Sequence, residues 1–162
     1  ILYSVASLGR GDVYKRQVID SKSQEHTILR DTILPGLIEN LSKNIHESYP
    51  QKLFEVGTVF SKAKPIHEAI NLAGVIAYKE SNYSEMKSIL QSILKTGFKI
   101  DSKTKTPKDN VITFANGRHS DIFVGEKSVG TIGEINSDVL DNFKIRTSVV
   151  GFEIKLSGLI FD

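Results

Sequence analysis

The 162 residues include 40% hydrophobic and 25% charged residues, a balance that predicts one soluble globular domain and excludes disorder over most of the chain. The absence of cysteine excludes disulfide scaffolds, cysteine-ligated zinc, iron–sulfur clusters and thiol nucleophiles, and it fits a reducing compartment. A net charge of +2 is too small to indicate nucleic-acid binding by itself. No apolar run is long enough to cross a bilayer. We therefore expect a cytoplasmic protein without a membrane segment.

The first half of the chain predicts a short strand, a helix and two strands. Apolar residues recur every three or four positions behind Pro35, which suits the first turn of a helix, and Tyr49-Pro50 should end that segment. Residues 51–60 are rich in aromatic and β-branched types and have no helical period, which predicts a buried strand. Residues 70–78 predict a strand that is buried on both faces. These four elements span residues 26–29, 34–45, 51–60 and 70–78.

A second helix is the clearest pattern in the sequence. Ser81 or Asn82 can cap its start, and Gly97 is placed to end it in the left-handed conformation. Its apolar positions follow the helical period and predict a stripe that a sheet must cover. They are Met86, Ile89, Leu90, Ile93 and Leu94.

The remainder predicts a loop, three strands, a short helix and a final strand. The lysines of the loop are expected to be solvated rather than to form a phosphate-binding patch, and Asn116-Gly117 and Gly125-Glu126 are hairpin-like turns. The element order predicts an α+β fold whose sheet is largely antiparallel with helices on one face. The segments are 101–109, 111–115, 120–124, 128–135, 137–143 and 149–154, and the loop lysines are Lys103, Lys105 and Lys108.

The sequence contains no recognisable catalytic, cofactor or metal motif. Its histidines are scattered without zinc spacing, and the phosphate-binding and nucleophile-elbow patterns are absent. Gly130 and Gly133 lie in a strand pattern and indicate close packing or a bulge. We therefore predict no catalytic residue, no bound cofactor and no metal ligand in this chain.

Three carboxylates, Glu55, Glu134 and Glu153, lie inside apolar strands. An unpaired charge there would cost several kcal/mol, so each needs a cationic partner, and Arg30 and Arg118 are the natural candidates. We expect an internal set of ion pairs that holds the sheet. An acid–base site is the alternative.

An ordered series of local patterns resembles the phenylalanine–tRNA ligase beta chain. The resemblance runs from about Val18 to Asp162, whereas residues 1–16 match nothing and are interpreted as a disordered or non-native lead-in to a domain at 17–162. The segment around Phe114-Ala115-Asn116-Gly117-Arg118, with no tryptophan in the chain, is closer to the archaeal and eukaryotic form. The matching segments are Leu29–Leu37 with Asn44, Leu53–Phe60, Leu72–Ile76, Ser84–Lys87, Gly117-Arg118, Val129–Ile135 with Val139-Leu140, and Gly151–Ile154.

The resemblance implies a C-terminal catalytic-like module with a class II aminoacyl-tRNA synthetase fold. Working sites of that class use two arginines that clamp ATP, but the matching positions here hold Val59-Phe60-Ser61 and the arginine-free stretch Phe152–Leu159. The module is therefore expected to be structural, with ATP and magnesium belonging to the whole enzyme. The structural signature carried over from the family is Arg30, Pro35, Glu55, Gly57, Arg118, Gly133, Glu134 and Glu153.

Two functions follow from this resemblance. The first is a noncatalytic module that pairs with the alpha subunit in a heterotetramer that charges tRNA(Phe). The second is an independently active nucleotide- or amino-acid-binding domain of the same fold. Titration with ATP and phenylalanine would separate them.

Overall fold

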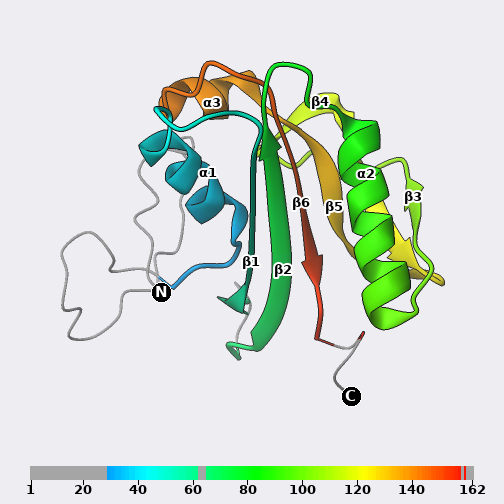
Figure 1. Ribbon diagram of the computed structural model, residues 1–162. Helices are drawn as coiled ribbons and strands as arrows, with labels where there is room; N and C mark the ends of the chain where they lie inside the picture. The colour runs from blue at the N-terminus through cyan, green and yellow to red at the C-terminus, as the bar shows by residue number, and fades with distance from the viewer. Residues whose placement is uncertain (1–28, 62–64, 158, 160–162) are drawn as a thin grey trace.

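The computed structural model describes residues 29–61, 65–157 and 159 (Figure 1). The expected lead-in at 1–16, and all of the strand expected at 26–29 except Leu29, lie outside these residues. The described chain forms a six-stranded sheet in the order β1-β2-β6-β5-β4-β3, with every neighbouring pair antiparallel. The strands are β1 (Gln51–Phe60), β2 (Glu68–Ala77), β3 (Lys103–Lys105), β4 (Phe114–Val124), β5 (Lys127–Ile135) and β6 (Val149–Lys155).

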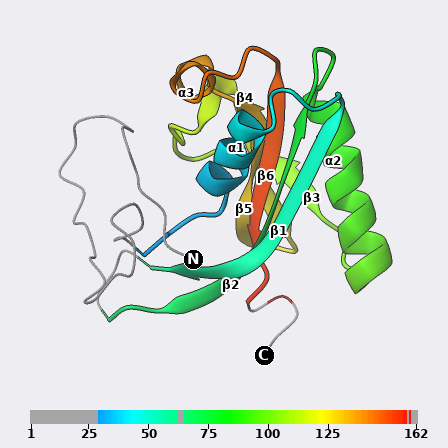
Figure 2. The same cartoon turned by 60° about the vertical axis from the view of Figure 1, so that its left-hand side comes forward.

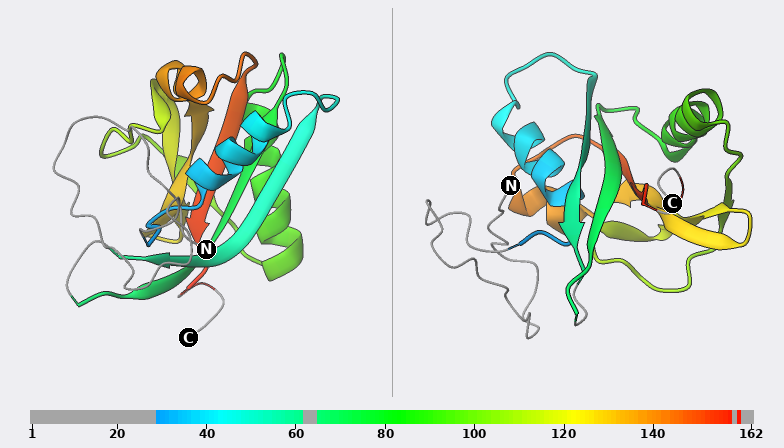
Figure 3. Two further views of the ribbon diagram at one scale, coloured as in Figure 1. Left: turned by 90° about the vertical axis from the view of Figure 1, so that its left-hand side faces the viewer. Right: turned by 90° about the horizontal axis from the view of Figure 1, so that it is seen from below.

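The helices lie on both faces of the sheet, so the expectation that they share one face is wrong (Figure 3). Helices α1 (Leu34–Lys43) and α3 (Ser137–Asn142) pack on one face, whereas α2 (Tyr83–Ser92) and the π turn η1 (Ile93–Gly97) pack on the other. Two separate apolar clusters result because the central strands are buried on both sides. No helix of the described chain is long and apolar enough to span a bilayer.

Helix α1 follows the predicted pattern. Pro35 occupies its first turn, where the missing N–H costs nothing. The sheet covers the apolar stripe up to Leu41, whereas the helix ends at Lys43 and Ile45, expected to belong to the stripe, lies beyond it and is exposed. The buried residues of the stripe are Leu34, Leu37, Ile38 and Leu41.

Helix α2 begins as predicted but ends differently. The side chain of Asn82 accepts a hydrogen bond from the Glu85 N–H, which confirms the predicted cap. Gly97 is not left-handed; that conformation falls on Lys99, with φ of 60°. The π turn carries the helix further, and the Ile100 N–H then donates to the Leu94 carbonyl at 3.0 Å, so the chain reverses two residues later than predicted.

Strand β1 has the predicted bounds but is buried on one face only. It forms one edge of the sheet, and the side chains of Phe54 and Val56 are 78% and 54% exposed. Helix α1 covers the opposite face, which carries Leu53 and Val59. The composition predicted a strand correctly, but it could not indicate that only one face would find a partner.

One predicted turn and one predicted loop in the second half of the chain need correction. Asn116-Gly117 does not close a hairpin: β4 continues through it, and Gly117, with φ of 72°, forms a bulge that shifts the register with β5. Residues 103–105 are not a loop, because they add β3 to the far edge of the sheet. The turn at Gly125-Glu126 is confirmed as the β4–β5 hairpin.

A polar contact between Tyr78, Glu85 and Lys52 joins α2 to the β1–β2 end of the sheet. The Tyr78 hydroxyl donates to one Glu85 carboxylate oxygen at 2.6 Å, and Lys52 Nζ donates to the other at 2.9 Å. The hydrogen bond from Tyr78, followed by that from Lys52, lowers the pKa of Glu85 below its ordinary value of 4.5. The same bond raises the pKa of Tyr78, because ionisation of the phenol would destroy it.

We predict that Glu85→Gln removes a pH-dependent contribution to stability. A carboxylate with a lowered folded-state pKa contributes stability above its unfolded pKa, and this contribution is lost as the pH falls through the folded value. Thermal unfolding should therefore separate the variant from wild type at pH 7, and the difference should shrink as the pH falls below the unfolded-state pKa of about 4.3 and through the lower folded-state pKa. Glu47→Gln, at an exposed position, is the control. A separation that persists unchanged at low pH would contradict this account.

Candidate functional site

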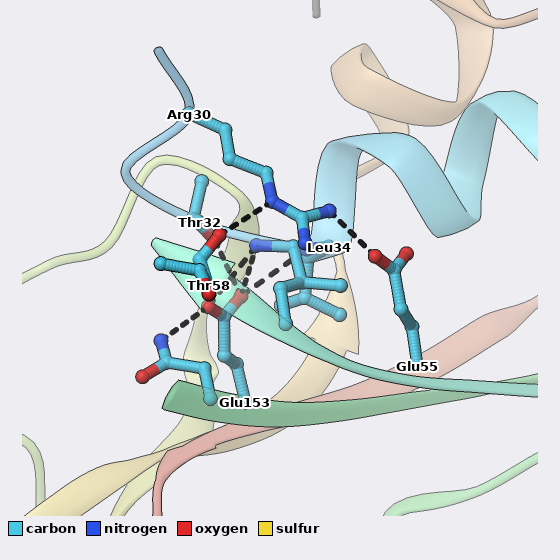
Figure 4. Close-up of polar contacts among 8 residues, drawn as sticks. Arg30, Thr32, Leu34, Glu55, Thr58 and Glu153 are labelled. Carbon is cyan, nitrogen blue, oxygen red and sulfur yellow. Dashed lines mark hydrogen bonds and ion pairs between the residues drawn. The ribbon is translucent and has the colours of Figure 1, made fainter. Parts of the chain in front are cut away.

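Five of the eight signature residues gather at the N-terminus of α1, where it meets β1, β2 and β6 (Figure 4). Arg30, Glu55, Gly57 and Glu153 all belong to this cluster, and Pro35 lies in the adjoining first turn of the helix. We call this group the α1 entry cluster. The segments that form it are far apart in sequence and are brought together by the order of the strands.

Arg30 is the buried cation of the α1 entry cluster. Its side chain is 4% exposed, and Nη1 donates to Glu55 Oε1 at 2.6 Å. Its Nε donates to the Thr58 carbonyl at 2.9 Å, so the guanidinium binds both a side chain and the backbone of β1. The predicted pairing of Glu55 with an arginine is thus present, and the partner is Arg30.

Gly57 makes room for this guanidinium. A Cβ at position 57 would overlap a terminal nitrogen of Arg30 and crowd the Glu55 carboxylate. The glycine of the signature is therefore explained by the close approach of a charged side chain to the strand backbone.

Glu153 has no cationic partner in the α1 entry cluster, which corrects the expectation of an ion pair. Its carboxylate instead accepts bonds from the N–H groups of Ile33 and Leu34, the Thr32 hydroxyl and the Asn71 amide, at 2.5 to 3.1 Å. The first residues of α1 have no side-chain cap of their own. A carboxylate at a helix N-terminus satisfies free N–H groups and interacts favourably with the helix dipole, so no cation is needed.

Sequence reasoning missed Thr32 and Asn71 as members of this cluster. Thr32 carried a usable signal, because a threonine just before a helix is a typical capping residue. Its hydroxyl donates to Glu153 instead of accepting from the helix. Asn71 lay within an apolar run and carried no such signal.

The remaining signature residues lie outside the α1 entry cluster. Arg118 of β4 pairs with Glu134 of β5 at 2.8 Å, as predicted for a carboxylate within a strand, but the two side chains are 66% and 32% exposed. Gly133 sits between His119 and Gly151 in the register of the sheet, where the strands approach closely. This part of the signature stabilises the β4–β5 hairpin.

The face of the sheet that meets α1 carries a polar row next to the cluster. Cross-strand partners share one face, and one row of partners runs through all six strands. Three of its members are carboxylates and one is a lysine, so the row is acidic. In strand order it contains Glu55, Ala73, Glu153, Thr131, Asp121 and Lys105.

We predict strong energetic coupling between Arg30 and Glu55. Arg30→Met or Glu55→Gln alone leaves the other charge without its partner, which costs about 3 kcal/mol for a buried pair, whereas the double variant should lose much less than the sum. Denaturant unfolding of the four proteins measures this coupling. The same cycle on the exposed pair Arg118–Glu134 is the matched control, and its coupling should stay below about 1 kcal/mol. Equal couplings in the two cycles would contradict the role given to burial.

We also predict that Glu153→Gln destabilises the domain by about 2 kcal/mol, since it replaces a charged acceptor of several bonds with a neutral amide whose NH₂ faces donors. Denaturant unfolding again provides the measurement. Glu126→Gln, on a side chain that is 96% exposed, serves as control and should change stability by less than about 0.5 kcal/mol. An unchanged midpoint for Glu153→Gln would show that the helix N-terminus does not depend on the carboxylate.

Comparison with solved structures supports the fold. A pyrrolysyl-tRNA synthetase of Desulfitobacterium hafniense superposes with a TM-score of 0.65 at 15% identity, covering 86% of this chain and 51% of that one. At this identity the likeness concerns the fold alone. It confirms the predicted α+β, class II aminoacyl-tRNA synthetase-like architecture.

Sequence comparison identifies the family. The pattern of the family described as "Phenylalanyl tRNA synthetase beta chain CLM domain" matches residues 12–156. Phenylalanine–tRNA ligase beta subunits of the archaea Archaeoglobus fulgidus and Pyrococcus abyssi are 37% and 36% identical over 90% and 88% of this chain. The chain spans about a quarter of the length of these relatives, 25% and 26%. The chain therefore belongs to the family of phenylalanyl-tRNA synthetase beta chain CLM domains.

Proposed function

We propose that this chain is a noncatalytic module of a phenylalanine–tRNA ligase beta subunit. It pairs with the catalytic alpha subunit in the cytoplasm, where the complete heterotetramer attaches phenylalanine to tRNA(Phe) at the expense of ATP. The observation that carries this proposal lies in the α1 entry cluster. The two features best suited to bind an anion, the Arg30 guanidinium and the N-terminus of α1, are each occupied by a carboxylate of the chain itself.

The residues of this face do not fit ATP. A nucleotide triphosphate needs free cations or free backbone N–H groups, whereas the face around the α1 entry cluster presents Glu55, Glu153 and Asp121 in one row. Glu55 holds the guanidinium of Arg30, and Glu153 occupies the helix N–H groups. The groups on this face that could bind phosphate are thus already occupied by carboxylates of the chain, so nucleotide binding is assigned to other parts of the enzyme.

The positions of the two expected ATP-binding arginines agree with this proposal. Ser61 follows β1, where its N–H donates to the His67 carbonyl, and it carries no charge. The final strand β6 and the residues after it also lack arginine. Within the described residues, no group of three or more His, Asp or Glu side chains is placed to hold a metal ion.

We predict that the isolated chain neither binds ATP nor forms phenylalanyl-adenylate, but that it binds the alpha subunit. Calorimetric titration with ATP, magnesium and phenylalanine should give no binding heat, and pyrophosphate exchange should stay at the blank level. Size-exclusion chromatography with the purified alpha subunit should yield a complex. Phenylalanine-dependent exchange by the chain alone would favour an independent nucleotide- or amino-acid-binding domain instead. Failure to bind the alpha subunit would remove the pairing role.

A further inference from the structure

His119 is a buried titratable side chain that lies outside the α1 entry cluster. It belongs to β4, two residues after the bulge at Gly117, and it is only 5% exposed. Its ring stacks on the ring of Phe114, with the two centroids 5.9 Å apart. Gly133 is its cross-strand partner and leaves it room, because a Cβ at position 133 would overlap the His119 Cβ. The imidazole is therefore packed on its ring face and against the next strand.

Both ring nitrogens of His119 face a backbone carbonyl oxygen. Nδ1 lies 3.1 Å from the Ala115 oxygen, across the bulge, and Nε2 lies 3.4 Å from the Asp109 oxygen. A carbonyl oxygen can only accept, so each nitrogen needs a proton to form a hydrogen bond with it. Neutral imidazole has one N–H and leaves a lone pair against the other oxygen, whereas imidazolium has two N–H groups. The geometry therefore suits the protonated ring.

The contact with Asp109 attaches the segment 106–113, which connects β3 to β4. This segment forms no helix or strand, and most of its residues are exposed. Two further bonds attach it to the domain. The Lys108 N–H donates to the Asp121 carboxylate at 3.3 Å, and the Thr113 carbonyl accepts from an N–H at the start of α3 at 3.0 Å, where the chain enters β4 (Figure 2). In an exposed, irregular segment, one hydrogen bond changes the free energy of local opening appreciably.

The sheet face around His119 is acidic. Asp121 follows two residues later on the same face and belongs to the polar row that also contains Glu153. Lys105 of β3 is opposite Asp121, and its ammonium lies 3.5 Å from the Glu126 carboxylate. The carboxylates of this face therefore favour positive charge on the ring.

The other elements next to His119 leave this balance unchanged. Its cross-strand neighbours on β5 and β6 are glycines, and Arg118 is paired with Glu134 at 2.8 Å. The charged side chains of the segment 106–113 and of α3 belong to exposed residues, where water and salt screen their charge. They are Lys108, Asp109, Asp138 and Asp141.

We propose that His119 is a pH-sensitive latch, which fastens the segment 106–113 to β4 through a doubly protonated ring. When Nε2 releases its proton to water, the shorter bond to Ala115 is kept and the bond to Asp109 is lost. Protonation adds a bond only to the attached arrangement, so the latch is closed at the acidic end of the range in which histidine titrates, about pH 5 to 8, and opens as the pH rises. The segment carries Ile112, which is 71% exposed, so the latch sets how firmly this apolar side chain is held. The latch is independent of any pairing with the alpha subunit.

Hydrogen exchange of the Lys108 and Phe114 amides measures the attachment of the segment. Both amides are bonded in the attached arrangement, to Asp121 and to the Val111 carbonyl. Their protection factors, corrected for the intrinsic effect of pH on exchange, should fall about tenfold between pH 5.5 and pH 8, because a hydrogen bond to a charged group is lost. Carboxylic acids titrate below this range.

Two substitutions of His119 separate its two hydrogen bonds. The side-chain nitrogen of asparagine can take the place of Nδ1 and that of glutamine the place of Nε2, and neither amide titrates. His119→Asn and His119→Gln should therefore both abolish the pH dependence of protection. Protection should be higher in His119→Gln, because only this variant keeps a donor for Asp109. His46→Asn, at an exposed position, is the control and should keep the wild-type profile.

Nitrogen NMR of the His119 ring gives a second measurement that needs no substitution. Both ring nitrogens should carry a proton at pH 5.5, and only Nδ1 should carry one at pH 8. A ring with a single proton at both pH values would overturn the latch, and so would a pH-dependent protection that persists in His119→Asn. If both variants fail to fold, the wild-type chain still decides. Protection that stays constant while the ring titrates would equally overturn the latch.

Discussion

A charged side chain on a sheet that has helices packed on both faces must be neutralised or hydrogen-bonded by neighbouring groups. This constraint shapes the domain. Glu55 and Glu153 lie on the face that meets α1, and each is satisfied by a different device. A buried guanidinium binds the first, whereas the free N–H groups of a helix bind the second. The position of α1, the glycine at 57 and the bend of the chain before the helix all follow from these two solutions.

The same arrangement uses anion-binding groups to stabilise the fold. A helix N-terminus and a buried arginine are the groups with which proteins commonly bind anionic substrates. In this domain they bind internal carboxylates, and the interactions hold β1, β6 and α1 together. Residue chemistry that would serve a ligand in an open site instead contributes to folding.

Much of the fold was predictable from the sequence because it depends on local period and capping. The bounds of β1, the Asn82 cap and the α3 helix required only neighbouring residues. The errors concern properties set by distant partners: the exposed face of β1, the pairing of β3, and the bulge at Gly117. At the α1 entry cluster, residue types predicted that Glu55 pairs with an arginine but left Arg30 and Arg118 open, and the structure identifies Arg30. Residue types did not predict the contacts of Glu153 with the backbone, because nearly every residue has an N–H group and the residue type does not indicate which of these groups a carboxylate will bind.

The contacts of Glu153 also bear on the order of folding. Helix α1 has ten residues, a length that is marginal for an isolated helix in water. The group that caps it is 119 to 121 residues further along the chain. The helix therefore gains its N-terminal partner only after the last strand has joined the sheet. Such long-range closure raises the contact order and slows folding, and it couples the first helix and the final strand into one cooperative unit.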